Sequence, residues 1–191
     1  MGRARREPGA LVIGVDASAA GMAESSLRTA RPERRGGLPN ALFVVAAAEC
    51  PPSDLHGIAD ELTILFPWGS LLRGALALDD AAAAGIARLV RAGGRVEVLA
   101  SATERDGQGV PPLRAEDGPA IARRWACRGL ALTTFEPASA PQIAASGSTW
   151  ARRLGASGGR GRADGPSDAG AIGRPTWRLV LRRDGRLALG R

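Results

Sequence analysis

The segment ELTILFPWGSLLRG, residues 61–74, decides the fold, because in it an apolar strand ends abruptly at a proline and a tryptophan. Apolar residues dominate the stretch from Ile58 to Phe66, which predicts a buried strand of a parallel sheet ending at Pro67. Trp68 comes next, and a tryptophan is costly to expose unless its ring finds a partner. Either Trp68 packs in the core under a loop, or it forms a stacking platform at the mouth of a site.

Strands and helices alternate on both sides of this segment. Towards the N-terminus we expect a strand over Ala10–Asp16, a helix over Ala19–Thr29 and a second strand over Ala41–Ala47. Towards the C-terminus the predicted elements are a helix over Asp79–Arg91, a strand over Gly94–Ala100, a helix over Asp117–Cys127, a strand over Leu130–Phe135 and a mostly helical stretch over Pro141–Leu154. Residues 155–173 are rich in glycine, alanine, serine and aspartate and predict a flexible loop.

The end of the chain predicts a pair of strands. Trp177–Arg183 and Arg186–Leu189 flank Asp184-Gly185, a sequence typical of a tight turn. Alternating strands and helices closed by such a pair indicate an α/β fold, with helices on both faces of the sheet and an antiparallel strand near one edge. In sheets of this kind, ligands bind beyond the carboxyl ends of the strands.

Composition and charge narrow the class of protein. The chain has 191 residues and a mass of 19.7 kDa, which predicts a single domain over residues 1–191. Its 26 basic residues, all arginine, exceed its 19 acidic residues and give a net charge of +7. Such a charge favours nucleic acid as a partner first and an anionic membrane second.

Other features of composition concern location and assembly. Cys50 and Cys127 have neither metal-ligand spacing nor a disulfide framework, so we expect no metal site and a cytoplasmic protein. The longest apolar stretch, Ala41–Ala48, is far shorter than a membrane span. We expect no membrane association and a monomer.

Acidic residues follow two of the predicted strands. Asp16 ends the first, where a carboxylate can accept hydrogen bonds from both ribose hydroxyls of a nucleoside cofactor. Glu49 follows Ala46–Ala48, whose small side chains would let the backbone approach a flat adenine. The alternatives are an aspartate that starts a loop and a glutamate that is simply solvated.

A second tryptophan stands beside two arginines. Trp150 lies in GSTWARRL, residues 147–154, on a connection between late elements of the chain. Enzymes that act on a nucleobase extrude it from the stack and hold it between flat side chains. Trp68 and Trp150 suit that chemistry, although tryptophan is more often a core residue.

Three segments together carry a resemblance to a known family. GGLPNALFVVAAAE (36–49), ELTILFPWGSLLRG (61–74) and STWARRL (148–154) closely resemble the aminoglycoside-resistance methyltransferases that modify N1 of adenine 1408 in 16S ribosomal RNA. The resemblance runs in order from about residue 10 to residue 154. It implies a class I S-adenosylmethionine-dependent methyltransferase with a Rossmann-like sheet, acting on the 30S ribosomal subunit.

The resemblance also implies roles for individual residues. On the cofactor side, Asp16 would bind the ribose, and Ala48, Glu49 and Pro67 would lie along the bound S-adenosylmethionine. Trp68 and Trp150 would stack on the flipped adenine as the catalytic pair. The residues assigned to RNA are Ser148 near that pocket, Arg153 on the RNA-facing side, and Arg31, Arg34 and Arg35 in a linker against the rRNA backbone.

The expected chemistry agrees with the scarcity of general bases. N1 of adenine carries a lone pair and no proton, so it can attack the sulfonium methyl group directly, and positioning does the work. The single histidine, His56, is expected in a surface loop without a catalytic partner.

One departure from the family pattern concerns the start of the sequence. The chain opens with MGRARREPG and runs directly into what resembles the second strand of the family, without an Asp-x-Gly-x-Gly turn before Asp16. The first strand, the glycine loop and most of the first helix are therefore expected to be missing, which makes the sheet N-terminally truncated. Its two neighbouring strands would either keep unpaired edges or close up on each other, and we expect the chain to bind S-adenosylmethionine very weakly or not at all.

Two other functions compete with methylation of ribosomal RNA. A non-catalytic, basic RNA-binding module would retain the tryptophans and arginines without using the cofactor. A small-molecule methyltransferase would use the same fold, but the arginine-rich linker and the paired tryptophans argue against it.

Overall fold

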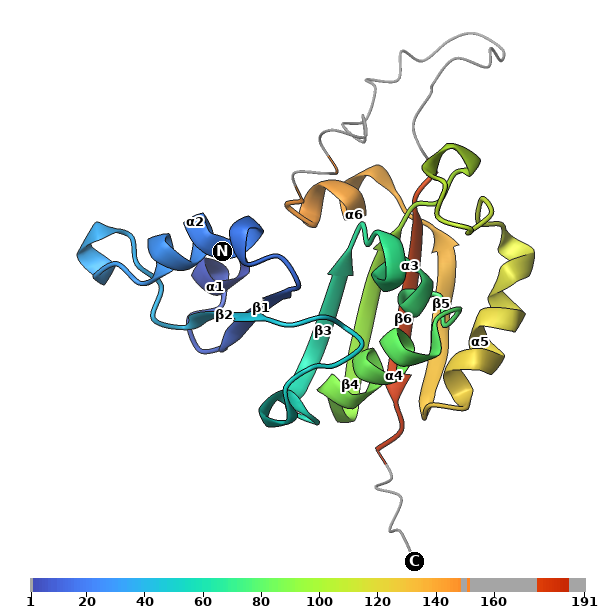
Figure 1. The fold of residues 1–191 in the computed structure, drawn as a ribbon, viewed down its shortest axis with the longest axis horizontal. Helices are drawn as coiled ribbons and strands as arrows, with labels where there is room; N and C mark the ends of the chain where they lie inside the picture. Colours follow the sequence, from blue (N-terminus) through green and yellow to red (C-terminus); the bar gives the residue numbers. More distant parts are fainter. Residues whose placement is uncertain (1, 149–150, 152–174, 186–191) are drawn as a thin grey trace, which may run out of the picture.

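The structure is a computed structural model and describes residues 2–148, 151 and 175–185. Its strands form two sheets (Figure 1). In the smaller sheet, β1 (Val12–Asp16) pairs in parallel with β2 (Ala41–Val45). The larger sheet has the order β3-β4-β6-β5 and is built from β3 (Ala59–Leu65), β4 (Val90–Ala100), β5 (Leu130–Pro137) and β6 (Trp177–Arg183).

Strand direction in the larger sheet is mixed. β3 runs parallel to β4, whereas β6 lies antiparallel between β4 and β5. An antiparallel strand beside the edge strand is what the sequence predicts. The predicted hairpin of residues 177–189 is wrong, because β4 and β5 already occupy both edges of β6. Its second half, residues 186–189, lies outside the described residues.

Helices connect the strands, and polar side chains cap several of them. They are α1 (Gly2–Arg6), α2 (Ala19–Thr29), α3 (Gly69–Ala75), α4 (Asp80–Leu89), α5 (Gly118–Ala126) and α6 (Ala140–Ala145). Asp79 caps α4, because its Oδ1 accepts a hydrogen bond from the Ala82 N–H at 3.1 Å. The predicted mostly helical stretch over residues 141–154 is interrupted, since α6 ends at Ala145 and residues 146–148 are not helical. Ala151 is helical again, and residues 149–150 and 152–154 lie outside the described residues. Sequence patterns did not predict α1 or α3, because both helices are short and contain glycine.

The apolar core lies between α3–α5 and one face of the larger sheet. Trp125 is its largest fully buried side chain, and the indole Nε1–H donates to the Ala75 carbonyl at 3.2 Å. Phe135 and Trp177 stack with ring centroids 4.6 Å apart. Two of the four tryptophans, Trp125 and Trp177, are therefore core residues. No helix among the described residues is long and apolar enough to cross a membrane.

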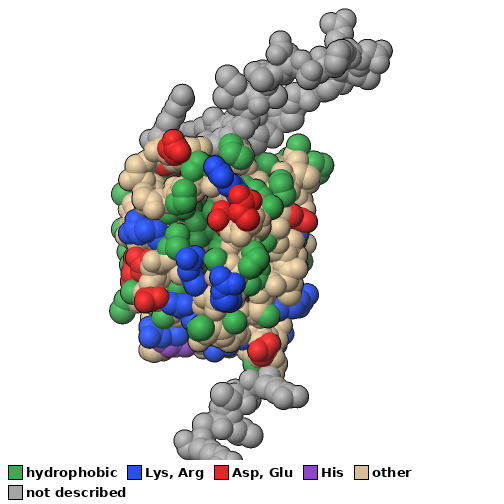
Figure 2. All heavy atoms as spheres, turned by 90° about the vertical axis from the view of Figure 1, so that its right-hand side faces the viewer, with side chains coloured by type: hydrophobic (Ala, Val, Ile, Leu, Met, Phe, Trp, Pro, Cys, Tyr) green, Lys and Arg blue, Asp and Glu red, His purple; other side chains and the backbone are tan. Residues whose placement is uncertain are grey.

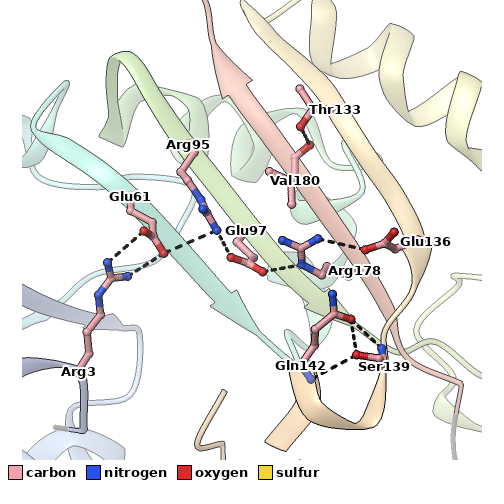
Figure 3. A network of polar contacts seen from close by, with 10 residues as sticks. All are labelled: Arg3, Glu61, Arg95, Glu97, Thr133, Glu136, Ser139, Gln142, Arg178 and Val180. Carbon is pink, nitrogen blue, oxygen red and sulfur yellow. Dashed lines mark hydrogen bonds and ion pairs between the residues drawn. The ribbon is translucent and has the colours of Figure 1, made fainter. Parts of the chain in front are cut away.

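The opposite face of the larger sheet carries a ladder of alternating charges (Figure 3). It begins on α1, where Arg3 donates two hydrogen bonds to Glu61 of β3, at 2.9 and 3.1 Å. It continues through Arg95 and Glu97 of β4 to Arg178 of β6, whose Nε lies 2.7 Å from the Glu97 carboxylate. It ends at Glu136 of β5, 3.1 Å from Arg178. Each charge has a neighbour of opposite sign, which is what a partly buried charged group requires.

This ladder makes the stability of the fold sensitive to acid. The hydrogen bond from Arg3 is the main reason why the pKa of Glu61 lies below its ordinary value, and burial opposes it only in part. A lowered carboxyl pKa stabilises the fold above the ordinary value, and this contribution is lost as pH falls through the folded-state value.

We therefore predict that Glu61→Gln lowers the melting temperature by a few degrees at pH 7 and that this deficit is smaller at pH 3. Glu24→Gln is the matched control, because Glu24 pairs with Arg28 on an exposed helix surface. Thermal melts followed by circular dichroism at both pH values measure the effect. An equal deficit at both pH values would contradict the prediction.

Candidate functional site

The candidate site lies at the carboxyl ends of β1, β2 and β3. Asp16 closes β1, and its carbonyl accepts a hydrogen bond from the Ala46 N–H at 3.0 Å, which extends the β1–β2 pairing by one step. The chain after β2 therefore leaves beside Asp16. β3 ends at Leu65, and Pro67 and Trp68 follow it directly.

One oxygen of the Asp16 carboxylate accepts a hydrogen bond from the protein, and the other is available as an acceptor. Its Oδ1 accepts a hydrogen bond from the Ser18 N–H at 2.7 Å, while Ser18 Oγ caps α2 by accepting from the Gly21 N–H. Asp16 is exposed, and its Oδ2 makes no hydrogen bond with a described residue. An oriented carboxylate with a free acceptor suits the hydroxyls of a sugar.

The segment Ala48–Glu49 is positioned by a glycine of α4. A Cβ atom built on Gly85 would lie 1.7 Å from the Ala48 carbonyl oxygen and 3.1 Å from Pro51 Cδ, so only glycine allows this contact. Ala48 and Glu49 are half-buried in a turn. The backbone after β2 thus packs directly against α4, the helix that precedes β4 of the larger sheet.

Trp68 stands on a turn fixed by its neighbours. The Phe66 N–H donates to the Leu99 carbonyl at 2.7 Å, which continues the β3–β4 pairing past the end of β3. Phe66 and Gly69 both have positive φ, 49° and 60°, so the chain reverses sharply around the buried Pro67. The Trp68 side chain is 53% exposed. It is therefore not a core residue, unlike Trp125 and Trp177.

Gln108 holds the same turn from a different loop, and sequence reasoning missed it. Its Oε1 accepts a hydrogen bond from the Gly69 N–H at 3.0 Å, and its Nε2–H donates to the Asp106 carbonyl at 2.9 Å. Gly69 opens α3, where an N–H has no partner within the helix. No local sequence pattern indicates this contact, since the two residues are 39 positions apart.

The other predicted site residues are described only in part. Ser148 follows α6 and is half-buried, with its N–H donating to Ser146 Oγ at 3.2 Å. Trp150 and Arg153 lie outside the described residues. The pairing of Trp68 with Trp150 therefore stays a prediction.

The three linker arginines are exposed on a tight turn after α2. Arg34 and Arg35 belong to a single turn of 3-10 helix, and Arg31 precedes it. The turn closes tightly at Gly37, where a Cβ atom would lie 1.6 Å from the Arg31 carbonyl oxygen. None of the three arginines forms an ion pair with a described residue. All three side chains are exposed, and Arg31 lines a hollow of about 630 Å³.

The fold defines a class of protein. Its α/β arrangement, in which β6 runs antiparallel to both neighbours beside the edge strand β5, is that of the S-adenosylmethionine-dependent methyltransferases. The model of the NpmA family, 16S rRNA (adenine(1408)-N(1))-methyltransferase, matches residues 1–165. The chain belongs to that family.

Individual relatives agree with this assignment. A 16S rRNA (adenine(1408)-N(1))-methyltransferase of Streptoalloteichus hindustanus is 34% identical over 160 residues, which cover 81% of this chain and 74% of the relative. The crystal structure of the 16S rRNA methyltransferase KamB aligns with a TM-score of 0.77 at 28% identity, covering 96% of this chain and 81% of that one. The crystal structure of a W203A mutant of the Catenulisporales acidiphilia 16S rRNA (adenine(1408)-N(1))-methyltransferase with cosubstrate SAM aligns with a TM-score of 0.75 at 27% identity. The alignment covers 95% of this chain and 79% of that one.

The contact between Ala48 and Gly85 yields a test of the cofactor side of the site. We predict that Gly85→Ala displaces the Ala48–Glu49 segment and weakens S-adenosylmethionine binding at least about tenfold, because the new methyl group overlaps the Ala48 carbonyl. Gly185→Ala is the control, since a Cβ there meets nothing within 4 Å. Isothermal titration calorimetry compares the variants, and equal affinities would contradict the placement of the cofactor beside Ala48.

Proposed function

We propose that this chain binds S-adenosylmethionine and transfers its methyl group to N1 of adenine 1408 in the 16S rRNA of the 30S subunit, giving aminoglycoside resistance. The observation that carries the proposal is Trp68, a half-exposed aromatic ring on a turn fixed by the β3–β4 pairing and by Gln108. Exposing such a ring has a cost that binding a flat base would recover.

The residues at the strand ends fit the nucleoside part of the cofactor. The free oxygen of Asp16 suits the ribose, and the half-buried turn at Ala48 and Glu49 offers backbone and small side chains to an adenine ring. Pro67, which is buried and directly precedes Trp68, would lie along the bound cofactor. When bound, S-adenosylmethionine supplies a methyl group on a positively charged sulfur atom.

The protein's part in the reaction is positioning. N1 of adenine has a lone pair and no proton, so no side chain has to remove one before transfer. Trp68 would hold the extruded base from one side, and we propose Trp150 for the other. His56 takes no part, because it is exposed and its Nε2 lies 3.2 Å from the Pro51 carbonyl of its own loop.

Substitution of Trp68 tests the stacking role. We expect Trp68→Ala to reduce methylation of 30S subunits at least about tenfold while leaving S-adenosylmethionine affinity close to normal, since stacking contributes about 1–3 kcal/mol per base. Trp68→Phe keeps a flat ring and is expected to restore most of the activity.

Leu78→Ala is the matched control, because Leu78 is another exposed apolar side chain. The readout is incorporation of labelled methyl groups at adenine 1408. If Trp68→Ala methylates at the parent rate, Trp68 does not hold the base. S-adenosylmethionine binding with methylation of a small molecule but not of 30S subunits would favour the competing enzyme class.

The linker arginines test the RNA partner. We expect Arg31→Ala, Arg34→Ala and Arg35→Ala combined to weaken 30S binding and to reduce its salt dependence by about one unit of slope for each phosphate that an arginine no longer neutralises. Arg153→Ala, assigned to the same partner, is expected to act in the same direction.

A matched control removes the same charge elsewhere. Arg114, Arg123 and Arg124 are exposed on or next to α5. The face of the molecule drawn in Figure 2 carries basic, acidic and apolar side chains interspersed with one another. Changing these three to alanine is expected to leave the salt slope nearly unchanged. Equal effects of the two triple variants, measured as 30S affinity at several salt concentrations, would show that net charge alone drives binding.

A further inference from the structure

Trp68 stands at a position where another type of residue is usually found. It directly precedes the first residue of α3, where serine, threonine, aspartate or asparagine normally accepts a hydrogen bond from a free N–H of the helix. A tryptophan side chain offers no acceptor, and Trp68 forms no such bond. The start of α3 therefore has no cap from its own segment.

The missing hydrogen bond comes from another part of the chain. Gln108 Oε1 accepts from the Gly69 N–H, the first N–H after Trp68, at 3.0 Å. Among the described residues, this is the one side-chain hydrogen bond made to the turn of residues 66–69. The Gln108 amide thus links the backbone that carries Trp68 to the loop that follows β4.

Both polar atoms of the Gln108 amide are engaged. Its Nε2–H donates to the Asp106 carbonyl at 2.9 Å, and because a carbonyl can only accept, the amide cannot be turned over without losing both bonds. Asp106 belongs to a short turn that its own carboxylate closes by accepting from the Thr103 N–H at 2.8 Å. The amide is therefore held between two segments of ordered backbone.

The loop that carries Gln108 is anchored in the core at both ends. Ala102 before it and Val110 after it are 3% and 5% exposed and belong to the apolar core. Gly107 and Gly109, on either side of Gln108, have positive φ of 62° and 66°, a conformation that favours glycine. This backbone brings Gln108 to the Trp68 turn without strain in the flanking residues.

We propose that Gln108 is a positioning residue for methyl transfer, which holds the Trp68 turn so that the indole ring is in place before the adenine enters. This role rests on the proposed function and deepens it, because Gln108 acts through Trp68 and not on the base itself. Ordering a half-exposed ring at the moment of binding would reduce affinity for the base. With Gln108 present, the turn is ordered in the free protein.

The first test observes Trp68 directly in the 191-residue chain. Labelling with fluorotryptophan gives one fluorine NMR signal for each of the four tryptophans, and Trp68→Phe identifies the signal of Trp68. We expect Gln108→Leu to shift this signal by more than its line width, because leucine fills similar space but can neither accept nor donate a hydrogen bond. The signals of Trp125 and Trp177 are expected to stay in place, since both rings lie in the core.

Two further variants separate the hydrogen bond from a general loss of stability. Gln108→Glu keeps an acceptor for the Gly69 N–H, so the Trp68 signal is expected to stay near its parent position. Ile121→Val removes one carbon atom from the core at α5 and lowers stability without changing the turn, so its Trp68 signal is expected to match the parent. An unchanged Trp68 signal in Gln108→Leu, or an equal change in Ile121→Val, overturns the proposal.

The second test asks whether Gln108 acts through Trp68. Gln108→Leu is expected to lower the rate of 30S methylation by about threefold or more, with the affinity for S-adenosylmethionine unchanged. In a Trp68→Ala background the same change is expected to have almost no further effect, because a residue that acts through another adds nothing once the other is removed. Losses that multiply in the double variant overturn the proposal, since Gln108 would then act elsewhere.

The outcomes distinguish a failure of this role from a failure of the proposed function. If Trp68→Ala loses methylation while Gln108→Leu keeps the parent rate, Gln108 is not a positioning residue and the proposed function stands. If Trp68→Ala methylates at the parent rate, the stacking role fails and the role of Gln108 fails with it. If the parent chain does not methylate 30S subunits, the proposed function fails, and the fluorine signal still decides whether Gln108 orders Trp68.

Discussion

The hydrogen-bonded pairing of β3 with β4 is the constraint on which the site depends. It runs in register to Leu65 and Leu99 and then continues through the Phe66 N–H, which bonds the same Leu99 carbonyl. This last bond anchors the backbone at Phe66, where the sharp turn that carries Trp68 begins. A platform for a nucleobase works only if it is rigid before the base arrives, because ordering it afterwards would cost binding free energy. The buried β4, covered by α3–α5, supplies that rigidity.

Arginine has two separate uses in this molecule. Arg3, Arg95 and Arg178 are neutralised in the ladder across the larger sheet, where each lies beside at least one carboxylate. They hold α1 and the strands together and contribute little to attraction at a distance. Arg31 and Arg34 stand on an exposed turn without ion-pair partners among the described residues. The net charge of +7 therefore indicates that a polyanion is a suitable partner. The arginines that lack a carboxylate neighbour indicate where such a partner would bind.

An element could be predicted from the sequence where the residues that determine it are close together along the chain. The apolar run of a strand such as β2 is visible within a few residues of sequence, and there the predicted strand was confirmed. The hairpin failed because Asp184-Gly185 is a good turn whether or not its flanks pair with each other. β6 pairs with β4 and β5 rather than with residues 186–189, and the sequence does not show which of these strands would be its partners. The charge ladder and Gln108 were missed for the same reason, because their partners lie tens of residues away in sequence.

The candidate site is divided between the two sheets. Asp16 belongs to the smaller sheet, whereas Pro67 and Trp68 follow a strand of the larger one, so the cofactor side and the base side meet only if the sheets keep their relative position. The ion pair of Arg3 with Glu61 and the seating of Ala48 on Gly85 both cross that boundary. Direct methyl transfer to N1 relies on alignment rather than on an acid or a base, and small errors in alignment cost large factors in rate. We therefore expect these contacts, which lie far from the proposed reacting atoms, to control the rate of methyl transfer by setting the distance between the two halves of the candidate site.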